Sequence, residues 1–179
     1  PGRGDRVKQV YLSWCKYIRR PDSMNEHVPY RLYFISLALP RMLKPVSYLY
    51  CGLVSFLILI YHRPQVVWMQ LAPPVALFVV FFYKKLFKRG AIVIADCHNS
   101  AFRAPFIHMP FAVKLMNSCD LMIVHNHEIE SQLESMGLRK ERAAVLSSPP
   151  ARIKFAGSEN ASPSGRTKKI LIFPCAYAS

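Results

Sequence analysis

The sequence predicts an α/β fold in which a parallel sheet is flanked by helices. Three observations support this prediction. Short apolar segments alternate with helical patterns along most of the 179 residues. The apolar segments lack polar alternation, which is typical of parallel strands covered on both faces. Strand and helix also repeat in the order that right-handed strand–helix–strand units require.

The first half of the chain contains three predicted strands, over 9–14, 30–36 and 65–71. A short helix over 19–28 separates the first two, and Pro21 is acceptable in its first turn. A longer helix over about 42–61 precedes the third strand, and a helix over 74–89 follows it. This last helix ends in basic residues and is followed by Gly90, which we expect to be its C-cap.

The second half continues with predicted strands over 91–96, 121–126 and 143–148. Helices are predicted over about 106–118 and over 128–137, the latter ending at Gly137. The segment 157–169 is rich in Ser, Gly and Lys and predicts a linker. We therefore expect one domain over 1–156, a linker over 157–169, and the start of a second domain over 170–179. The first residue is Pro1 and the last lies in an apolar segment, so we expect a fragment of a longer protein.

The composition restricts the classes of partner. With 24 Lys and Arg against 10 Asp and Glu, the formal net charge of +14 favours phosphate-bearing ligands or an anionic membrane. A hydrophobic content of 52% excludes a disordered nucleic-acid-binding tail. No nucleic-acid-binding motif accompanies the charge, so we expect no nucleic-acid partner. Five widely spaced cysteines argue against a disulfide framework and favour reduced thiols in a cytoplasmic protein.

Two uncharged segments, 45–62 and 64–83, are each long enough to span a membrane. The second contains Pro73 and Pro74 and fits a strand, a turn and a helix better. The first fits a spanning helix, a helix buried against a sheet, or a helix resting on a bilayer. The alternative to an enzyme is therefore a non-enzymatic integral membrane protein with one or two spanning helices within 45–83.

Polar residues cluster at the carboxyl ends of four predicted strands, where parallel α/β sheets bind ligands. The clusters are Ser13-Trp14 with Arg19-Arg20, Gln70 before two prolines, Asp96-Cys97-His98-Asn99, and His125-Asn126-His127. Asn126 is also a suitable N-cap for the helix that follows it.

The cluster Asp96-Cys97-His98-Asn99 allows four interpretations. A metal site would use Asp96 and His98, but no metal-binding motif with fixed spacing is present. A thiol nucleophile would use Cys97, although a cysteine at a strand end is more often a buried apolar residue. In the third interpretation, His98 and Asn99 bind a polar ligand and Asp96 shapes the turn. In the fourth interpretation, these side chains form hydrogen bonds only with the backbone and bind no ligand.

Four segments together resemble the N-terminal half of GT-B glycosyltransferases. They are "SWCKYIRRPDSMNEHV", "RPQVVWMQLAPPVAL", "IADCHNSAF" and "DLMIVHNHEIESQLESMG", and the resemblance covers roughly 10–150. The chain is similar to the large family-4-like group, which includes relatives of the β-mannosyltransferase acting on lipid-linked chitobiose. Within that group, the D-x-H-N turn and the Q-x-P-P turn carry the resemblance. Here the second turn reads "QLAPP", which is one residue longer.

The resemblance implies a Rossmann-like domain on the acceptor side of a two-domain enzyme. It implies a nucleotide-sugar donor held mainly by the second domain, and a glycan or lipid-linked acceptor. His98 then corresponds to the catalytic histidine of the cleft, while substrate-binding roles fall to Arg19, Arg20, Asp96, Asn99, His125 and Asn126. No cofactor or metal is implied. Together with the basic composition, the resemblance predicts a cytoplasmic enzyme in peripheral contact with an anionic membrane.

Overall fold

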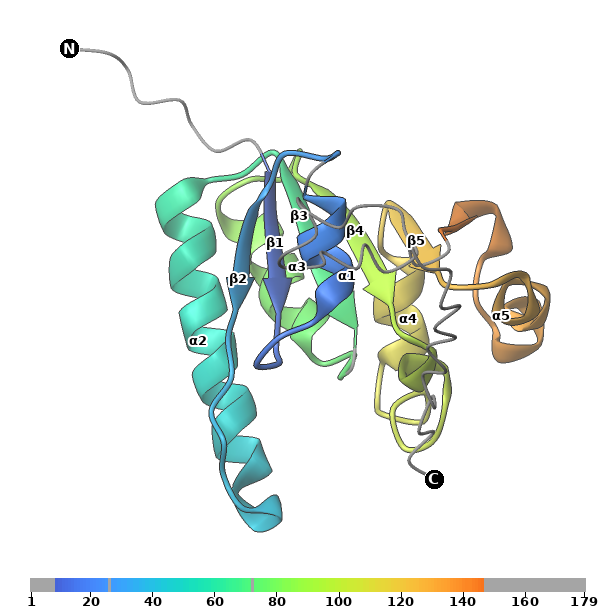
Figure 1. The fold of residues 1–179 in the computed structure, drawn as a ribbon, viewed down its shortest axis with the longest axis horizontal. Coiled ribbons are helices and arrows are strands. Elements are labelled where there is room, and N and C mark those ends of the chain that lie inside the picture. The colour runs from blue at the N-terminus through green and yellow to red at the C-terminus, as the bar shows by residue number, and fades with distance from the viewer. Residues whose placement is uncertain (1–8, 26, 72, 147–179) are drawn as a thin grey trace, which may run out of the picture. The chain divides into compact units, whose positions relative to one another are not determined.

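A six-stranded parallel sheet forms the centre of the structure (Figure 1). The computed structural model describes residues 9–25, 27–71 and 73–146. The strand order is β2-β1-β3-β4-β5-β6, and every neighbouring pair is parallel. The strands are β1 (Gln9–Ser13), β2 (Arg31–Phe34), β3 (Val66–Leu71), β4 (Ile92–Cys97), β5 (Leu121–Val124) and β6 (Ala143–Val145). This Rossmann-like arrangement confirms the predicted fold class. The expected linker and second domain lie outside the described residues.

The helices connect consecutive strands and cover the sheet on both faces. They are α1 (Arg19–Met24), α2 (Lys44–His62), α3 (Ala76–Leu86), α4 (Ala112–Asn117) and α5 (His127–Gln132). Side chains alternate along each strand, so each face of the sheet has its own core. The larger core contains Val67 and Val93 together with Leu59 of α2 and Val80 of α3. The smaller core, which includes Met24 of α1, is built on Tyr11, Trp68, Ile94 and Ile123.

The helices α2 and α3 pack closely against each other. Gly52 makes this possible, because a Cβ atom there would lie 3.3 Å from Cγ2 of Val79. One turn further along α2, the buried Oγ of Ser55 accepts a hydrogen bond of 2.9 Å from Nε1 of Trp14. α2 is therefore attached to the sheet through an indole that follows β1.

Four of the predicted helices, α1, α3, α4 and α5, are shorter than expected. α1 ends at Met24 rather than near 28, since Oδ1 of Asn25 accepts a hydrogen bond from the backbone amide of Tyr30 at 3.1 Å. This contact forms a turn that competes with further helix. α4 begins at Ala112 rather than near 106, because the preceding Phe111 has φ of 65° in the left-handed region and so stands outside a right-handed helix.

The two predicted glycine caps have opposite outcomes. Gly137 does end a helical segment, since its φ is 75° and its amide donates to the carbonyl of Glu134. That segment is a short 3-10 helix over Glu134–Met136, whereas α5 itself ends at Gln132. The C-cap at Gly90 is wrong. α3 ends at Leu86 with the right-handed Phe87 as C-cap, and Gly90 lies in the turn that leads into β4.

The two uncharged segments differ in structure. The second, 64–83, contains β3 and the first part of α3. This confirms the prediction that it forms a strand, a turn and a helix rather than a single helix. The first forms α2, and among the described residues it is the one helix long and apolar enough to cross a membrane. Length and composition alone support that possibility, and only 22% of its most apolar window is buried in the molecule.

Candidate functional site

A row of polar side chains crosses the carboxyl edge of the sheet. Ser13, Gln70, Asp96 and His125 each lie two residues beyond a residue of the smaller core, on β1, β3, β4 and just after β5. Because side chains alternate with a period of two, these four share the face of the sheet that α1 covers. Since the four strands are neighbours in the sheet, the polar residues form a continuous row. β1 and β3 also flank the point where the strand order reverses, which is the usual ligand position in such sheets.

Asp96 is the centre of this row. Asp96 is 2% exposed, and its carboxylate has partners on β1, on α1 and directly after β5. The hydroxyl of Tyr11 donates to Oδ2 at 2.6 Å, Nη2 of Arg20 lies 3.5 Å from Oδ1, and Nε2 of His125 lies 3.6 Å from the same oxygen. Asp96 therefore connects β1, α1 and the end of β5, rather than the turn that follows it.

Arg20 is buried, with 6% of its surface exposed. Its ion pair with Asp96 offsets part of the cost of burying a guanidinium. Within the described residues, none of its three nitrogen atoms makes a hydrogen bond. A guanidinium carries five N–H donors, and those of Arg20 are enclosed without a hydrogen-bond acceptor in the described part of the chain. The neighbouring Arg19 is exposed and begins α1.

His98 lies beside this network. Its ring and that of His125 are arranged edge to face with centroids 5.4 Å apart. Burial, and next the neighbouring His125, lowers the pKa of His98 below its usual value, so the ring is neutral near pH 7. Nδ1 accepts a hydrogen bond from the backbone amide of Ser100 at 3.4 Å. In the neutral ring the proton is then on Nε2, and His98 presents an N–H donor.

The two asparagines differ in environment. The side-chain oxygen of Asn99 is buried without a hydrogen-bond partner among the described residues, so no other group there uses it as an acceptor. Oδ1 of Asn126 accepts a hydrogen bond from the backbone amide of Ile129 at 2.8 Å, which confirms the predicted N-cap. Asn126 is thus already used in starting α5, while Asn99 is not used in this way.

The structure adds Tyr11 and Cys15 to the candidate site. It also joins Ser13 to Gln70, which were predicted in two separate clusters at strand ends. Tyr11 lies 85 residues from Asp96 in sequence and was predicted only as part of a strand. Ser13 donates a short hydrogen bond to Oε1 of Gln70, and Sγ of Cys15 lies 2.9 Å from the same serine hydroxyl. The signal for these residues is the period of two along β1 and β3, read together with the register that pairs the strands.

The interpretation of Cys97 as a nucleophile has no support in the structure. Its side chain is fully buried, and burial raises the pKa of the thiol well above its usual value. A protonated thiol is a weak nucleophile. Within residues 9–25, 27–71 and 73–146, no three His, Cys, Asp or Glu side chains are grouped in a way that would hold a metal ion. The ligand-binding interpretation of His98 and Asn99 remains compatible with this geometry.

The fold and its polar edge define a Rossmann-like α/β domain with a candidate ligand site at the carboxyl ends of its strands. Solved structures of Anabaena HepE have a similar fold. The complex with UDP and glucose matches with a TM-score of 0.51 at 13% identity, over 79% of this chain and 44% of HepE. The complex with UDP-glucose matches with a TM-score of 0.50 at 11% identity, over 78% of this chain and 43% of HepE.

The chain therefore spans less than half of the length of HepE. At this identity the likeness supports the Rossmann-like fold alone. No protein-family model matches the chain, and no curated protein matches its sequence.

Proposed function

We propose that this chain supplies the acceptor-side domain of a GT-B glycosyltransferase. The enzyme would transfer a sugar from a nucleotide-sugar donor to a glycan or lipid-linked acceptor. The main observation is the grouping of His98, His125, Asp96 and Arg20 at the carboxyl edge of the sheet. The likeness in fold to HepE, a protein crystallised with UDP-glucose, is consistent with this proposal.

In this proposal His98 acts as a hydrogen-bond donor rather than as a base. Its Nδ1 is engaged by Ser100, so Nε2–H is directed to a hydroxyl or ring oxygen of the transferred sugar. The hydrogen bond from such a fixed donor strengthens as charge develops on the acceptor. It therefore stabilises the transition state more than the ground state and lowers the barrier. Asn99 would contribute its unused side-chain oxygen to the acceptor.

Arg20 and His125 would bind near a phosphate of the donor or acceptor, with Asp96 holding both side chains in place. Arg19, exposed at the start of α1, is proposed as a second phosphate contact. The donor would be held mainly by a second domain, which fits the partial coverage of HepE. A cytoplasmic location is part of the proposal, in keeping with the unpaired cysteines among the described residues. Peripheral contact with a membrane is proposed as well.

The test is sugar transfer by the complete protein, assayed with a panel of labelled nucleotide sugars and with glycan and lipid-linked acceptors. We expect His98→Ala to lower kcat by about 100-fold, the scale seen when one fixed transition-state donor is removed. His27→Ala is the matched control, because His27 is exposed in the turn after α1. Unchanged turnover in His98→Ala would refute the assignment of His98. Failure to bind or turn over any nucleotide sugar would refute the function.

A further inference from the structure

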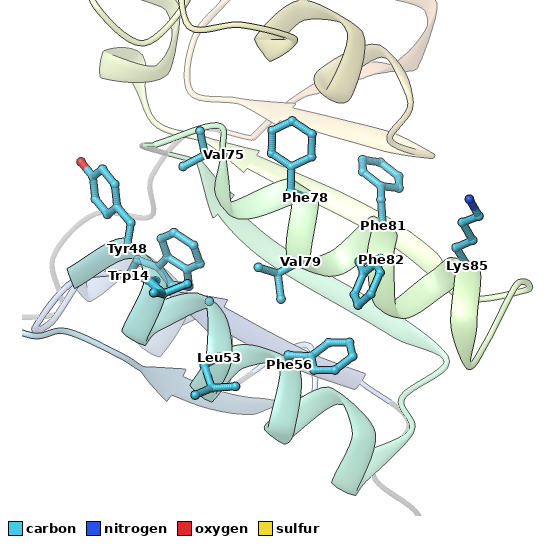
Figure 2. Close-up of a pocket in the computed structure, with 12 residues that line it drawn as sticks. Trp14, Tyr48, Leu53, Phe56, Val75, Phe78, Val79, Phe81, Phe82 and Lys85 are labelled. Carbon is cyan, nitrogen blue, oxygen red and sulfur yellow. The ribbon is translucent and has the colours of Figure 1, made fainter. Parts of the chain in front are cut away.

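The helices α2 and α3 form an apolar surface that no other part of the described chain covers. Between them lies a groove of about 730 Å³, with Trp14 and Tyr48 at one end and Lys85 at the other (Figure 2). We call this surface the α2–α3 face. Its exposed apolar residues are Val46, Leu49, Tyr50, Leu53, Leu57 and Tyr61 of α2, and Phe78, Phe82 and Leu86 of α3.

The residues of the α2–α3 face are regularly spaced. Those on α2 recur every three or four positions, so they form one stripe along the full length of the helix. Leu49 is 75% exposed and Tyr61 is 82% exposed. On α3 the exposed residues are four positions apart, which forms a second stripe beside the first. Contiguous apolar patches of this kind on a soluble protein mark a binding surface.

The same part of the chain is strongly basic. Residues 27–119 include ten Lys and Arg but a single acidic residue, Asp96. Asp96 is buried beside Arg20, so this stretch presents no exposed carboxylate in its described part. Lys85 lines the groove, and Arg63 and Arg89 are exposed near the same ends of the two helices. The surface therefore fits a partner that carries both apolar groups and negative charge.

We propose that the α2–α3 face binds the surface of an anionic lipid bilayer. α2 lies in the plane of the interface, its outer stripe contacts acyl chains, and the groove takes up a lipid chain. The basic residues contact phosphate headgroups. An amphipathic helix with cationic flanks is the usual element for such binding. This inference rests on the membrane contact of the proposed function and names the surface that makes it. It does not depend on sugar transfer.

The structure favours this occupant over two others. A second copy of the chain would bring two strongly basic faces together, and like charges oppose such a contact. A spanning arrangement of α2 would surround the helix with lipid and remove it from the sheet. Leu59 of α2 is fully buried against the sheet, and Ser55 accepts a hydrogen bond from Trp14. Both contacts would be lost if α2 spanned the bilayer.

The experiment is flotation of the full chain with vesicles of phosphatidylcholine, alone or mixed with phosphatidylglycerol. We expect binding to the mixed vesicles, about fivefold weaker for each basic contact removed and weaker still at high salt. Lys85→Glu should reduce binding, while Lys140→Glu makes the same charge change at an exposed position on another part of the chain and should not. The double variant Leu53→Ser/Phe82→Ser should also lose binding, whereas Tyr17→Ser, similarly exposed outside the face, should retain it. Circular dichroism checks that each variant is folded.

Three results would overturn the proposal. The first is equal binding to neutral and mixed vesicles. The second is resistance of the bound protein to alkaline carbonate extraction, which would indicate a spanning helix. The third is self-association without lipid that Leu53→Ser/Phe82→Ser abolishes, which would indicate a second copy on this face. His98→Ala should leave vesicle binding unchanged, so failure of the proposed function and failure of this inference are distinguishable.

Discussion

The hydrogen bond between Tyr11 and Asp96 provides a quantitative test of the buried network. Two tyrosines of the described residues, Tyr11 and Tyr83, are fully buried, and their hydroxyl groups differ in hydrogen bonding. The hydroxyl of Tyr11 donates to a carboxylate at 2.6 Å, whereas that of Tyr83 has no hydrogen-bond partner among the described residues. Replacing each with phenylalanine removes one oxygen atom and leaves the ring in place. The pair therefore isolates the contribution of the hydrogen bond.

We expect Tyr11→Phe to lower the free energy of unfolding by about 2 kcal/mol. Hydrogen bonds to charged groups contribute roughly 1.5–3 kcal/mol. Asp96 makes no other hydrogen bond in the described part of the chain, so the variant leaves the buried carboxylate with ionic partners alone. For a domain of this size, that loss corresponds to a fall in Tm of about 4–8 °C. Tyr83→Phe removes an unsatisfied buried group and should be neutral or stabilising by up to about 1 kcal/mol.

Urea denaturation followed by circular dichroism measures both variants, with equal m-values as the condition for comparing them. In an Asp96→Asn background, Tyr11→Phe should cost only about 1 kcal/mol, since the bond is then between neutral groups. A cost of Tyr11→Phe below about 0.5 kcal/mol, within the range of ordinary surface substitutions, would refute this reasoning. So would a cost in Tyr83→Phe as large as that in Tyr11→Phe.

The same bond has a consequence at alkaline pH. Burial, followed by the charge of Asp96, raises the pKa of Tyr11 well above its usual value. The folded state then keeps the phenol protonated where the unfolded chain begins to lose its proton. The stability contributed by Tyr11 is therefore complete below about pH 10 and declines as the pH rises further.

Two further predictions concern the elements that frame the site. Asn126→Ala removes the N-cap of α5 and should lower the free energy of unfolding by about 1 kcal/mol, measured by urea denaturation; an unchanged midpoint would contradict the capping role. Asp120 accepts hydrogen bonds from the amide of Val93 at 2.8 Å and from Lys84 at 3.0 Å. Burial tends to raise the pKa of Asp120, but these contacts outweigh it, and the net pKa is lowered. Its contribution to stability is thus present above about pH 4 and lost as the pH falls below. Asp120→Asn should accordingly show a smaller loss of stability in acid than the wild type, and an identical acid profile would count against this pairing.

Local sequence patterns were sufficient to predict the strands and their approximate order along the chain. Each strand of the sheet was predicted within a few residues, because an apolar segment bounded by turn residues is a local signal. The N-cap at Asn126 and the C-cap at Gly137 are local in the same sense. The errors at Gly90 and in the helix before 118 also have local causes. A turn ends α3 at Leu86, and the left-handed Phe111 delays the start of α4.

The candidate site required the tertiary structure. Residues at strand ends were predicted to lie near a ligand, but nothing in the sequence paired Tyr11 with Asp96 or buried Arg20 beside it. Such contacts depend on the strand order and on the register between neighbours, which are set by packing over the whole sheet. The role of α2 was likewise undecided, because its apolar pattern fits a buried, a spanning or an interfacial helix equally well.

The sequence by itself determined the parallel α/β class and the edge at which polar residues collect, since both follow from the periodicity and order of short segments. The tertiary structure decided which of those residues touch, and which side of α2 faces outward. The physical reason is that contacts between segments far apart in the chain depend on how the elements pack, and no local pattern records that packing.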